Sequence, residues 1–399
     1  MLSLVFCFVI NAQTTVSYTQ QTSSYDATFT DGTAGVFNNT GTEIGMYANA
    51  GAKQVAAWKN FTDDGTTSGN TTTMKVGDIF KISLSAYQAY GQIGVSLLSS
   101  PSETSAWINR INNYAVQVNL NGNSGEYDPW EIISNGGAVN ESTINGSSSG
   151  TINEFVFTFT LMSPTSMEVI IGRTNNTPTS FTQTVTINNS DISGFSIYLT
   201  DDWDSDSNEN IYWKQTTEYV YANVWDGSSD NDWATVANWS SNSVPTGSSN
   251  VRIPGTGITN YPTASAAVTI DNGYIESGAT LIAQDAFTGT ITYERNLGTT
   301  NWYMVSSPVI GETIQDLISN HTFATGTSPN IGIAPYINDG TAWSYQTTAS
   351  TGTLNSGQGY SVSLATPGNI SFTGAMPVAD IGVAITTNTN GFNLIGNPY

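Results

Sequence analysis

Short stretches in which every second residue is apolar run through the first half of this 399-residue chain, and they constrain its fold most. One of them places Phe155, Phe157, Phe159 and Leu161 on alternate positions, with Val or Thr between them. Successive side chains of a β-strand point to opposite faces, so this period of two predicts strands with one buried face. The same alternation recurs at residues 82–86, 93–97, 114–120 and 195–199. The pattern predicts an all-β fold.

Turn-forming dipeptides separate these stretches, and they favour tight connections between neighbouring strands. They are Asp31-Gly32, Asp64-Gly65, Asn121-Gly122, Asn135-Gly136 and Asn145-Gly146. A sheet with one apolar face must cover that face, and a second sheet is the economical cover for this many short strands. We therefore predict a jelly-roll-like β-sandwich over residues 13–222.

The composition changes at residue 223, after which three tryptophans gather at Trp225, Trp233 and Trp239. Their regular spacing predicts a packed structural signature rather than a binding surface. Short strands with Gly and Pro between them follow, so residues 223–297 are expected to form a Trp-rich β module, either a small sandwich or a few rungs of a solenoid. A further β module is expected over residues 298–399, incomplete at its C-terminus because the sequence stops in an apolar strand.

The N-terminal residues resemble a secretory signal peptide. An apolar run at residues 2–10 is followed by Asn11-Ala12-Gln13, and the run is too short to span a bilayer as a permanent helix. We expect residues 1–12 to be removed on export, and the missing basic start indicates a chain truncated at its N-terminus. No later stretch is apolar enough to cross a membrane. Removal would leave no cysteine, because the single one is Cys7.

The charge balance disfavours polyanionic partners. Nine Lys and Arg stand against thirty-one Asp and Glu, which gives a formal net charge of -22. Phosphate contacts require clustered basic side chains, so binding to nucleic acid or to an anionic membrane surface is disfavoured. Such a charge is typical of a protein that stays soluble outside the cell.

Few kinds of catalysis are open to this composition. Its one histidine, His321, has no nucleophile motif around it and is expected in a loop, and no phosphate-binding loop occurs. Glycoside hydrolysis needs two carboxylates, and Glu126, Asp128 and Glu131 around Trp130 form the most enzyme-like cluster. A solvated hairpin is the alternative that we favour there, and we predict that the chain is not an enzyme.

The clearest chemical signal is an acidic loop. Asp202, Asp204, Asp206 and Asn208 carry oxygen ligands on alternate positions, as in loops that wrap Ca²⁺. Bound calcium is one reading, and a solvated acidic loop is the other.

Aromatic residues lie beside this loop and another predicted turn: Trp203, Tyr212, Trp213 and Trp130. Sugar rings stack their C–H faces on aromatic planes while their hydroxyls bond polar side chains. The pattern therefore predicts a glycan-binding edge made by these four residues, with core packing as the alternative.

Several motifs in the second half resemble modules of large secreted and surface proteins of the Bacteroidetes, which the type IX secretion system exports. The resemblance rests on residues 225–227 with Trp233, Asn238-Trp239 and 244–245, on 302–308, on 357–360 and on 392–399. It implies an extracellular or cell-surface location, with the secretion machinery as a partner.

The first unit is similar to β-sandwich modules attached to polysaccharide-acting enzymes and adhesins of the same bacteria. Residues 81–84, 91–94, 201–204 and 211–213 carry this similarity. It implies a non-catalytic module array that binds polysaccharide or another glycan. Two alternatives stay open: the N-terminal part of a larger polysaccharide-degrading enzyme, and a structural surface stalk.

If calcium binds the acidic loop, thermal unfolding should depend on calcium. A ligand that binds the folded state alone raises its stability by about 2.7 kcal/mol at a hundredfold excess over Kd. Asp204→Ala should remove this dependence and leave calcium-free stability unchanged or slightly higher, because it also removes a repelling carboxylate. Equal melting temperatures of the unsubstituted chain in chelator and in millimolar calcium would show that the loop binds no calcium.

Overall fold

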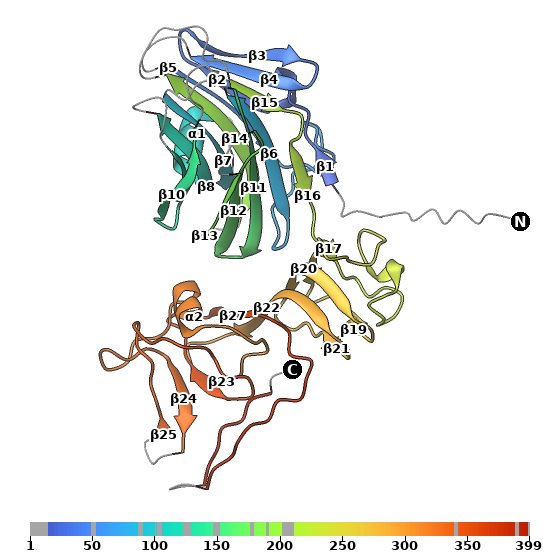
Figure 1. The fold of residues 1–399 in the computed structure, drawn as a ribbon, viewed down its shortest axis with the longest axis vertical. Helices are drawn as coiled ribbons and strands as arrows, with labels where there is room; N and C mark the ends of the chain where they lie inside the picture. The colour runs from blue at the N-terminus through green and yellow to red at the C-terminus, as the bar shows by residue number, and fades with distance from the viewer. Residues whose placement is uncertain are drawn as a thin grey trace, which may run out of the picture. The chain divides into compact units, whose positions relative to one another are not determined.

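The protein is seen in a computed structural model, which confirms the all-β prediction, since strands take up 52% and helices 5% of the chain. The structure describes residues 15–48, 53–86, 91–99, 101, 106–122, 129–146, 152–175, 179–188, 191–201, 211–338, 342–387 and 391–397. Two compact units contain Thr14–Tyr221 and Ala222–Tyr399 (Figure 1). Within the described ranges no helix has the length and apolar character needed to cross a bilayer.

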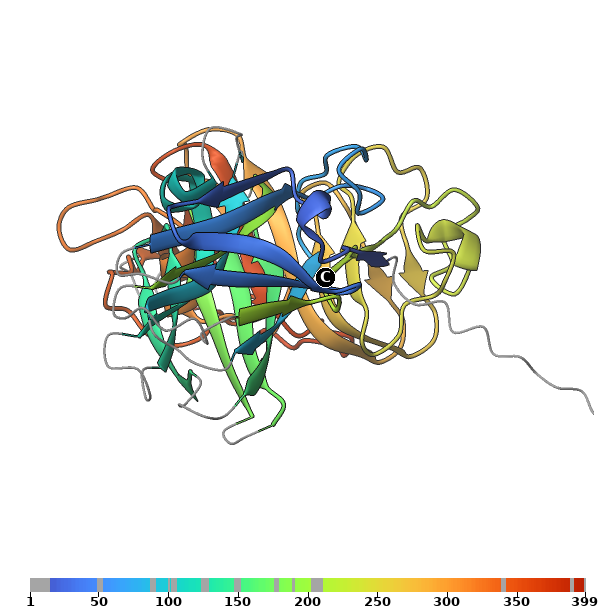
Figure 2. The same ribbon diagram turned by 90° about the horizontal axis from the view of Figure 1, so that it is seen from above.

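The first unit is a sandwich of two antiparallel sheets (Figure 1 and Figure 2). The seven-stranded sheet has the order β10 (Val139–Asn145), β9 (Pro129–Ser134), β8 (Tyr114–Gly122), β7 (Gly91–Ser99), β14 (Ile192–Asp201), β5 (Lys53–Asn60) and β2 (Ala27–Thr30). The nine-stranded sheet has the order β13 (Ser180–Thr186), β12 (Ser166–Arg173), β11 (Asn153–Ser163), β6 (Ile79–Ala86), β15 (Ile211–Lys214), β4 (Glu43–Ala48) and β3 (Ala34–Thr40), with β16 (Glu218–Val220) joining β1 (Thr15–Ser17) to β6. Each sheet combines strands from both ends of the unit, as a jelly-roll requires.

Aromatic rings fill the space between the two sheets. The alternating residues Phe155, Phe157 and Phe159 of β11 are buried, as the period of two predicts. Trp130 of β9 meets them from the other sheet, with its ring centroid 5.2 Å from that of Phe155 and 4.9 Å from that of Phe157. Burying a large apolar side chain contributes about 1.5–3 kcal/mol, so these rings account for much of the sheet-to-sheet adhesion.

One short helix, α1 (Ala106–Asn113), connects β7 to β8, in a segment where the alternation breaks. It lies against β5, β2, β7 and β14, all strands of the seven-stranded sheet. The 3-10 turn η1 (Thr22–Ser24) precedes β2. The helix therefore covers part of the face of this sheet that points away from the core, which is called the outer face below.

The second unit begins with parallel strands that form solenoid-like rungs. Strands β17 (Asn223–Val224), β18 (Asn250–Ile253), β20 (Val268–Ile275) and β22 (Phe287–Leu297) pair in parallel, and β27 (Gly368–Gly374) closes the sheet antiparallel to β22. Strands β19 (Thr263–Ala264) and β21 (Ile282–Ala283) make a second parallel pair. The fold class predicted for this region is confirmed in its solenoid-like form.

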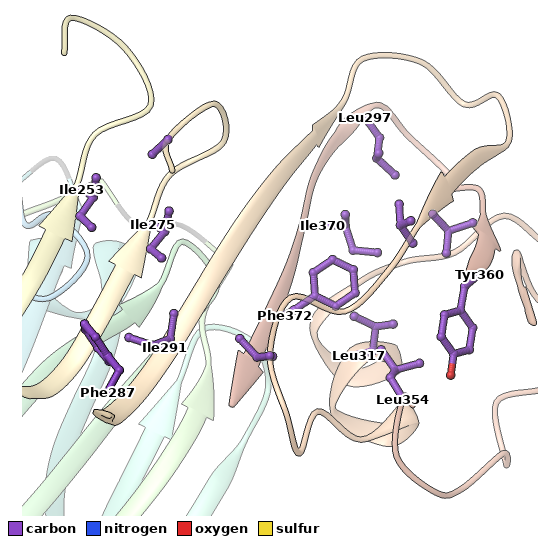
Figure 3. Close-up of a cluster of buried hydrophobic side chains, with 14 of the residues drawn as sticks. Ile253, Ile275, Phe287, Ile291, Leu297, Leu317, Leu354, Tyr360, Ile370 and Phe372 are labelled. Carbon is purple, nitrogen blue, oxygen red and sulfur yellow. The ribbon is translucent and has the colours of Figure 1, made fainter. Parts of the chain in front are cut away.

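The rest of this unit holds a four-stranded sheet and a short helix. The sheet has the order β23 (Tyr303–Val305), β26 (Tyr360–Val362), β24 (Ile333–Ile337) and β25 (Ala342–Trp343), and the helix is α2 (Ile314–Asn320). The 3-10 turn η2 (Val236–Asn238) lies earlier, between β17 and β18. One cluster of buried apolar side chains extends from Trp225 to Phe372. In Figure 3 it runs from Ile253 and Phe287 on the rungs to Leu317 on α2 and Tyr360 on β26. This core includes residues of both predicted modules, 223–297 and 298–399.

The three tryptophans near the start of this unit pack together, which confirms their predicted structural role. Trp225, Trp233 and Trp239 are buried, and the ring of Trp239 lies 5.0 Å from Trp225 and 4.7 Å from Trp233. Fully buried Asn238 holds the loop between them, because its amide nitrogen donates to Asp230 and its amide oxygen accepts the N–H of Ser229. The loop is thus built around one satisfied polar side chain.

Two titratable side chains cover the open edge of the five-stranded sheet. Strand β27 pairs with β22 on one side, so alternate N–H groups point away from the sheet on the other side. The N–H of Ser371 donates to Nε2 of His321 at 3.1 Å, and the N–H of Thr373 donates to a carboxyl oxygen of Glu312. His321, expected in a loop, follows α2 directly and closes this edge.

Burial shifts the pKa values of these two groups in opposite senses. It raises the pKa of Glu312 from 4.5 to about 7, against the hydrogen bond from Thr373, and the carboxylate of Asp316 adds to the increase. Burial lowers the pKa of His321 from 6.5 to about 4. Both groups are therefore favoured in their neutral forms at the sheet edge.

The stability of this unit should vary little between about pH 4.5 and 6.5, because the two groups oppose each other. The contribution of Glu312 is complete below pH 4.5 and is lost as pH rises through 7. That of His321 is complete above pH 6.5 and is lost as pH falls through 4. Each contribution is about 3 kcal/mol.

Calorimetry of isosteric variants checks this balance. Glu312→Gln keeps an acceptor for Thr373, and its stability should rise with pH under the influence of His321 alone. His321→Asn keeps an acceptor for Ser371, and its stability should fall as pH rises towards 7. Parallel pH profiles for the unsubstituted chain and both variants would contradict the assignment.

Candidate functional site

Polar side chains gather on the outer face of the seven-stranded sheet. Val118, Trp130 and Ile197 point into the core, so their strand neighbours Asn119, Glu131 and Tyr198 point outward. Backbone pairing places Tyr198 beside Gly94, Gly94 beside Asn119, and Asn119 beside Glu131. Four adjacent strands thus contribute to one row. We call Ser96, Arg110, Gln117, Asn119, Glu131 and Tyr198 the outer-face cluster.

The side chain of Tyr198 extends over Gly94 of β7 and contacts Asn119 on β8. Its hydroxyl donates to Oδ1 of Asn119 at 2.8 Å. Gly94 lies beneath this contact, and a Cβ at that position would overlap both the Tyr198 hydroxyl and the carbonyl oxygen of Val118. Burial raises the pKa of Tyr198 to about 12, although nearby Arg110 lowers it, so the phenol stays protonated and donates. Glycine at position 94 is what lets the tyrosine fix the orientation of the amide.

Arg110 of α1 holds the other half of the cluster. Its guanidinium lies 3.9 Å from the centroid of the Tyr198 ring, a cation–π contact. It also donates to Oε1 of Gln117 at 3.3 Å, and the hydroxyl of Ser96 donates to the same oxygen at 3.1 Å. Burial lowers the pKa of Arg110, yet an arginine keeps its charge in proteins. The amide of Gln117 is therefore fixed by two donors.

Both fixed amides are buried, with exposed fractions of 9% for Gln117 and 4% for Asn119, and their nitrogens have no partner among the described residues. Beside them Glu131 is half-buried, and it lies directly opposite exposed Glu141 on β10. Like charges in directly opposed positions destabilise a sheet, so these two carboxylates do not stabilise the pairing of β9 with β10.

The cluster can bind a ligand that has hydroxyl groups. Fixed amide N–H groups donate to hydroxyl oxygens, while the Glu131 carboxylate accepts hydroxyl hydrogens. Half-buried Phe29 and Tyr114 pack against Trp58 and Tyr198 on the same face and supply an apolar border. The combination suits a polyhydroxylated molecule with apolar C–H surfaces.

The sequence-predicted calcium loop lies outside the described residues. Asp202, Asp204, Asp206, Asn208 and the aromatic Trp203 all belong to it. Among the residues that are described, no group of three or more His, Cys, Asp or Glu side chains could hold a metal ion. Calcium binding therefore stays a prediction of the sequence.

The other predicted ligand-binding aromatics have mixed positions. Trp130 and Trp213 are fully buried in the core, so neither presents a ring face on which a sugar could stack. Tyr212 is half-buried on the outer face of the nine-stranded sheet, with its ring 6.2 Å from that of Phe37 in an edge-to-face contact. Of the enzyme-like acids, Glu131 belongs to the outer-face cluster, and Glu126 and Asp128 fall outside the described residues.

Sequence reasoning missed most of the outer-face cluster. Gln117 and Asn119 alternate with buried valines in β8, a pattern that reads as an ordinary solvated face. Arg110 reaches them from a helix whose position over the sheet no local pattern encodes. The available signal was Gly94, because a glycine inside a strand pattern often marks a close approach of another group.

No protein-family model matches this chain, and no curated protein matches it. Among solved structures, the Ca²⁺-bound exoplasmic/lumenal domain of VIP36 is 8% identical with a TM-score of 0.34, over 52% of this chain and 88% of that one. Basic winged bean lectin with Tn-antigen is 15% identical with a TM-score of 0.32, over 52% and 97%. Endo-β-1,4-glucuronan lyase from the fungus Trichoderma reesei is 8% identical with a TM-score of 0.31, over 53% and 96%. No residue role is transferred from them.

Substituting Gly94 by Ala should disrupt the cluster and destabilise the first unit by about 2 kcal/mol, because overpacking a strand forces side chain and backbone to move. Gly172→Ala is the matched control. It also lies inside a strand, but its Cβ would first meet the Val156 carbonyl oxygen at an ordinary 3.4 Å. Thermal unfolding of both variants checks this, and equal melting temperatures would contradict the close approach of Tyr198.

Proposed function

We propose that the first unit is a non-catalytic carbohydrate-binding module whose binding surface is the outer-face cluster. The observation that carries the proposal is the pair of fixed amides, Asn119 and Gln117, whose oxygens are bonded inside the sheet while their nitrogens have no partner within the described part of the chain. Orienting these groups before binding lowers the entropic cost of ordering them in a complex.

The electrostatics of the module favour neutral glycans. Glu131 and Glu141 are ready to accept hydroxyl hydrogens, and both would repel a uronate or a sulfate. The net charge of -22 acts in the same direction over longer distances. The substrate class that fits is a neutral polysaccharide or oligosaccharide.

We place this module in a secreted or cell-surface array. An exported chain is supported by the apolar N-terminal run. In this arrangement the second unit serves adhesion or display. Two alternatives are the N-terminal part of a larger polysaccharide-degrading enzyme and a structural stalk without a ligand. The binding experiment below separates them from this proposal.

Glycoside hydrolysis is the second candidate function, favoured by the opposed Glu131 and Glu141. Directly opposite Cβ atoms lie about 5 Å apart, and retaining glycosidases hold their two carboxyl groups about 5–5.5 Å apart. However, Glu141 is exposed and Glu131 half-buried, whereas a catalytic acid needs an apolar pocket. Binding without turnover is the better fit.

A glycan array of neutral and acidic oligosaccharides, followed by calorimetric titration of the best binder, tests the proposal on residues 13–399. Asn119→Asp keeps the acceptor for Tyr198 and removes the free donors, so affinity should fall by about tenfold. Glu131→Gln removes a charge-assisted acceptor and should cost a similar factor or more. Gln183→Glu, the same amide-to-acid change on β13 of the other sheet, should leave affinity unchanged.

Three outcomes would count against the proposal. The array could show no neutral glycan bound, which would favour the stalk. Asn119→Asp and Glu131→Gln could bind as tightly as the unsubstituted chain, which would place the surface elsewhere. Sugar release that Glu131→Gln or Glu141→Gln abolishes would make the unit an enzyme.

A further inference from the structure

A cleft of about 470 Å³ lies within the second unit. Strands β22, β23 and β27 form its walls together with the segment at residues 394–397. Its volume falls within the range of sites for small organic ligands. The lining includes Ser277, Tyr293, Arg295, Met304, Ser306 and Phe372.

Arg295 gives this cleft a positively charged side chain. From Ala222 onward the sequence has two basic side chains, Arg252 and Arg295, against eleven Asp and Glu. Arg252 forms an ion pair with Glu276 at 3.3 Å. Arg295 is exposed, and no carboxylate of the described residues lies within 4.0 Å of it.

The neighbouring residue, Glu294, also lines the cleft, but its side chain is buried and burial raises the pKa of its carboxyl group above the usual value. Adjacent residues of a strand point to opposite faces, so Glu294 lies on the other face of β22 from Arg295. There it accepts a hydrogen bond from Nδ2 of Asn369 at 2.7 Å and another from the hydroxyl of Tyr274. It is thus satisfied without Arg295.

Two serine hydroxyls add uncommitted donors to the cleft. Oγ of Ser306 is shielded from solvent and has no hydrogen-bond partner among the residues that are described. Backbone at Gly396 packs on it so closely that a Cβ there would overlap it. Oγ of Ser277 accepts the N–H of Asn296 at 2.7 Å, which leaves its own hydrogen to donate. A buried hydroxyl without a partner is costly unless a ligand completes it.

The geometry points to a binding site for a small organic carboxylate. One guanidinium and two hydroxyl donors offer hydrogen bonds to an anion with acceptor oxygens and no hydrogens to donate. Tyr293, Met304 and Phe372 supply an apolar wall for the body of such a molecule. A carboxylate would both neutralise Arg295 and satisfy Ser306. This site is independent of the outer-face cluster and of its proposed glycan.

Two kinds of molecule carry this group, a sugar acid and an aliphatic acid, and matched probes distinguish them. Glucuronate is compared with methyl glucoside, and hexanoate with hexanamide, by saturation-transfer NMR and calorimetric titration on residues 13–399. At least one carboxylate should bind about tenfold or more tightly than its neutral counterpart. Its affinity should weaken as ionic strength rises, because Arg295 is exposed. The carboxylate that binds more tightly, glucuronate or hexanoate, shows whether the site accepts a sugar acid or an aliphatic acid.

Variants locate the site. Arg295→Gln should weaken carboxylate binding by about tenfold to a hundredfold. Ser306→Ala should weaken it as well, while the melting temperature stays unchanged or rises, because the substitution removes a hydroxyl that no described residue bonds. Arg252→Gln, the other arginine of the unit, is the control and should leave carboxylate affinity unchanged.

The proposal is overturned if both carboxylates bind no better than their neutral counterparts, or if Arg295→Gln binds them like the unsubstituted chain. It is also overturned if Ser306→Ala lowers the melting temperature without changing affinity, since the hydroxyl would then be structural. Asn119→Asp should leave carboxylate binding intact, so failure of the glycan proposal and failure of this one are read separately.

Discussion

Close packing of the two sheets through aromatic side chains is the constraint on which the first unit depends. Trp130 from one sheet meets Phe155 and Phe157 from the other, and the rings leave no room for a different register. A slip of one residue would exchange Trp130 for Glu131 and bury a carboxylate among the rings. The position of every outward-facing residue on β8, β9 and β14 therefore follows from the core. The packing of the aromatic core therefore fixes the positions of the residues in the outer-face cluster.

The sequence predicted the β-sandwich because alternation is a local signal, readable within a few residues. The cluster depends on contacts that are distant in sequence, such as the bond between Tyr198 and Asn119, 79 residues apart. It depends also on α1, whose placement over the sheet carries Arg110 to Gln117. Neither register between distant strands nor the docking of a helix has a local pattern. Glu131 was the one member of the cluster found beforehand, and on the strength of its acidic neighbours.

Tryptophan shows how the same residue type gave opposite outcomes. Trp225, Trp233 and Trp239 were correctly assigned to a core from their spacing. Trp130 and Trp213 were predicted to bind a glycan, with core packing as the alternative, and the structure buries both. The alternation of faces along the strand was the better indicator of burial. Trp130 lies on the same face as buried Ile132, and Trp213 on the same face as buried Ile211. The alternation that predicts a strand also decides which of its residues can meet a ligand.

The fold completes some buried polar groups at a cost and leaves others without a partner. The N–H groups of Ser371 and Thr373 point off a sheet edge, and the chain buries His321 and Glu312 in their neutral forms to pair with them. Within the described part of the chain, the amide nitrogen of Asn119 and the shielded hydroxyl of Ser306 are two of the groups that have no partner. Sequences depart from local consistency mainly at functional sites. The proposed glycan surface lies beside the carboxylates of Glu131 and Glu141, whereas the proposed carboxylate site lies in a cleft that holds the guanidinium of Arg295.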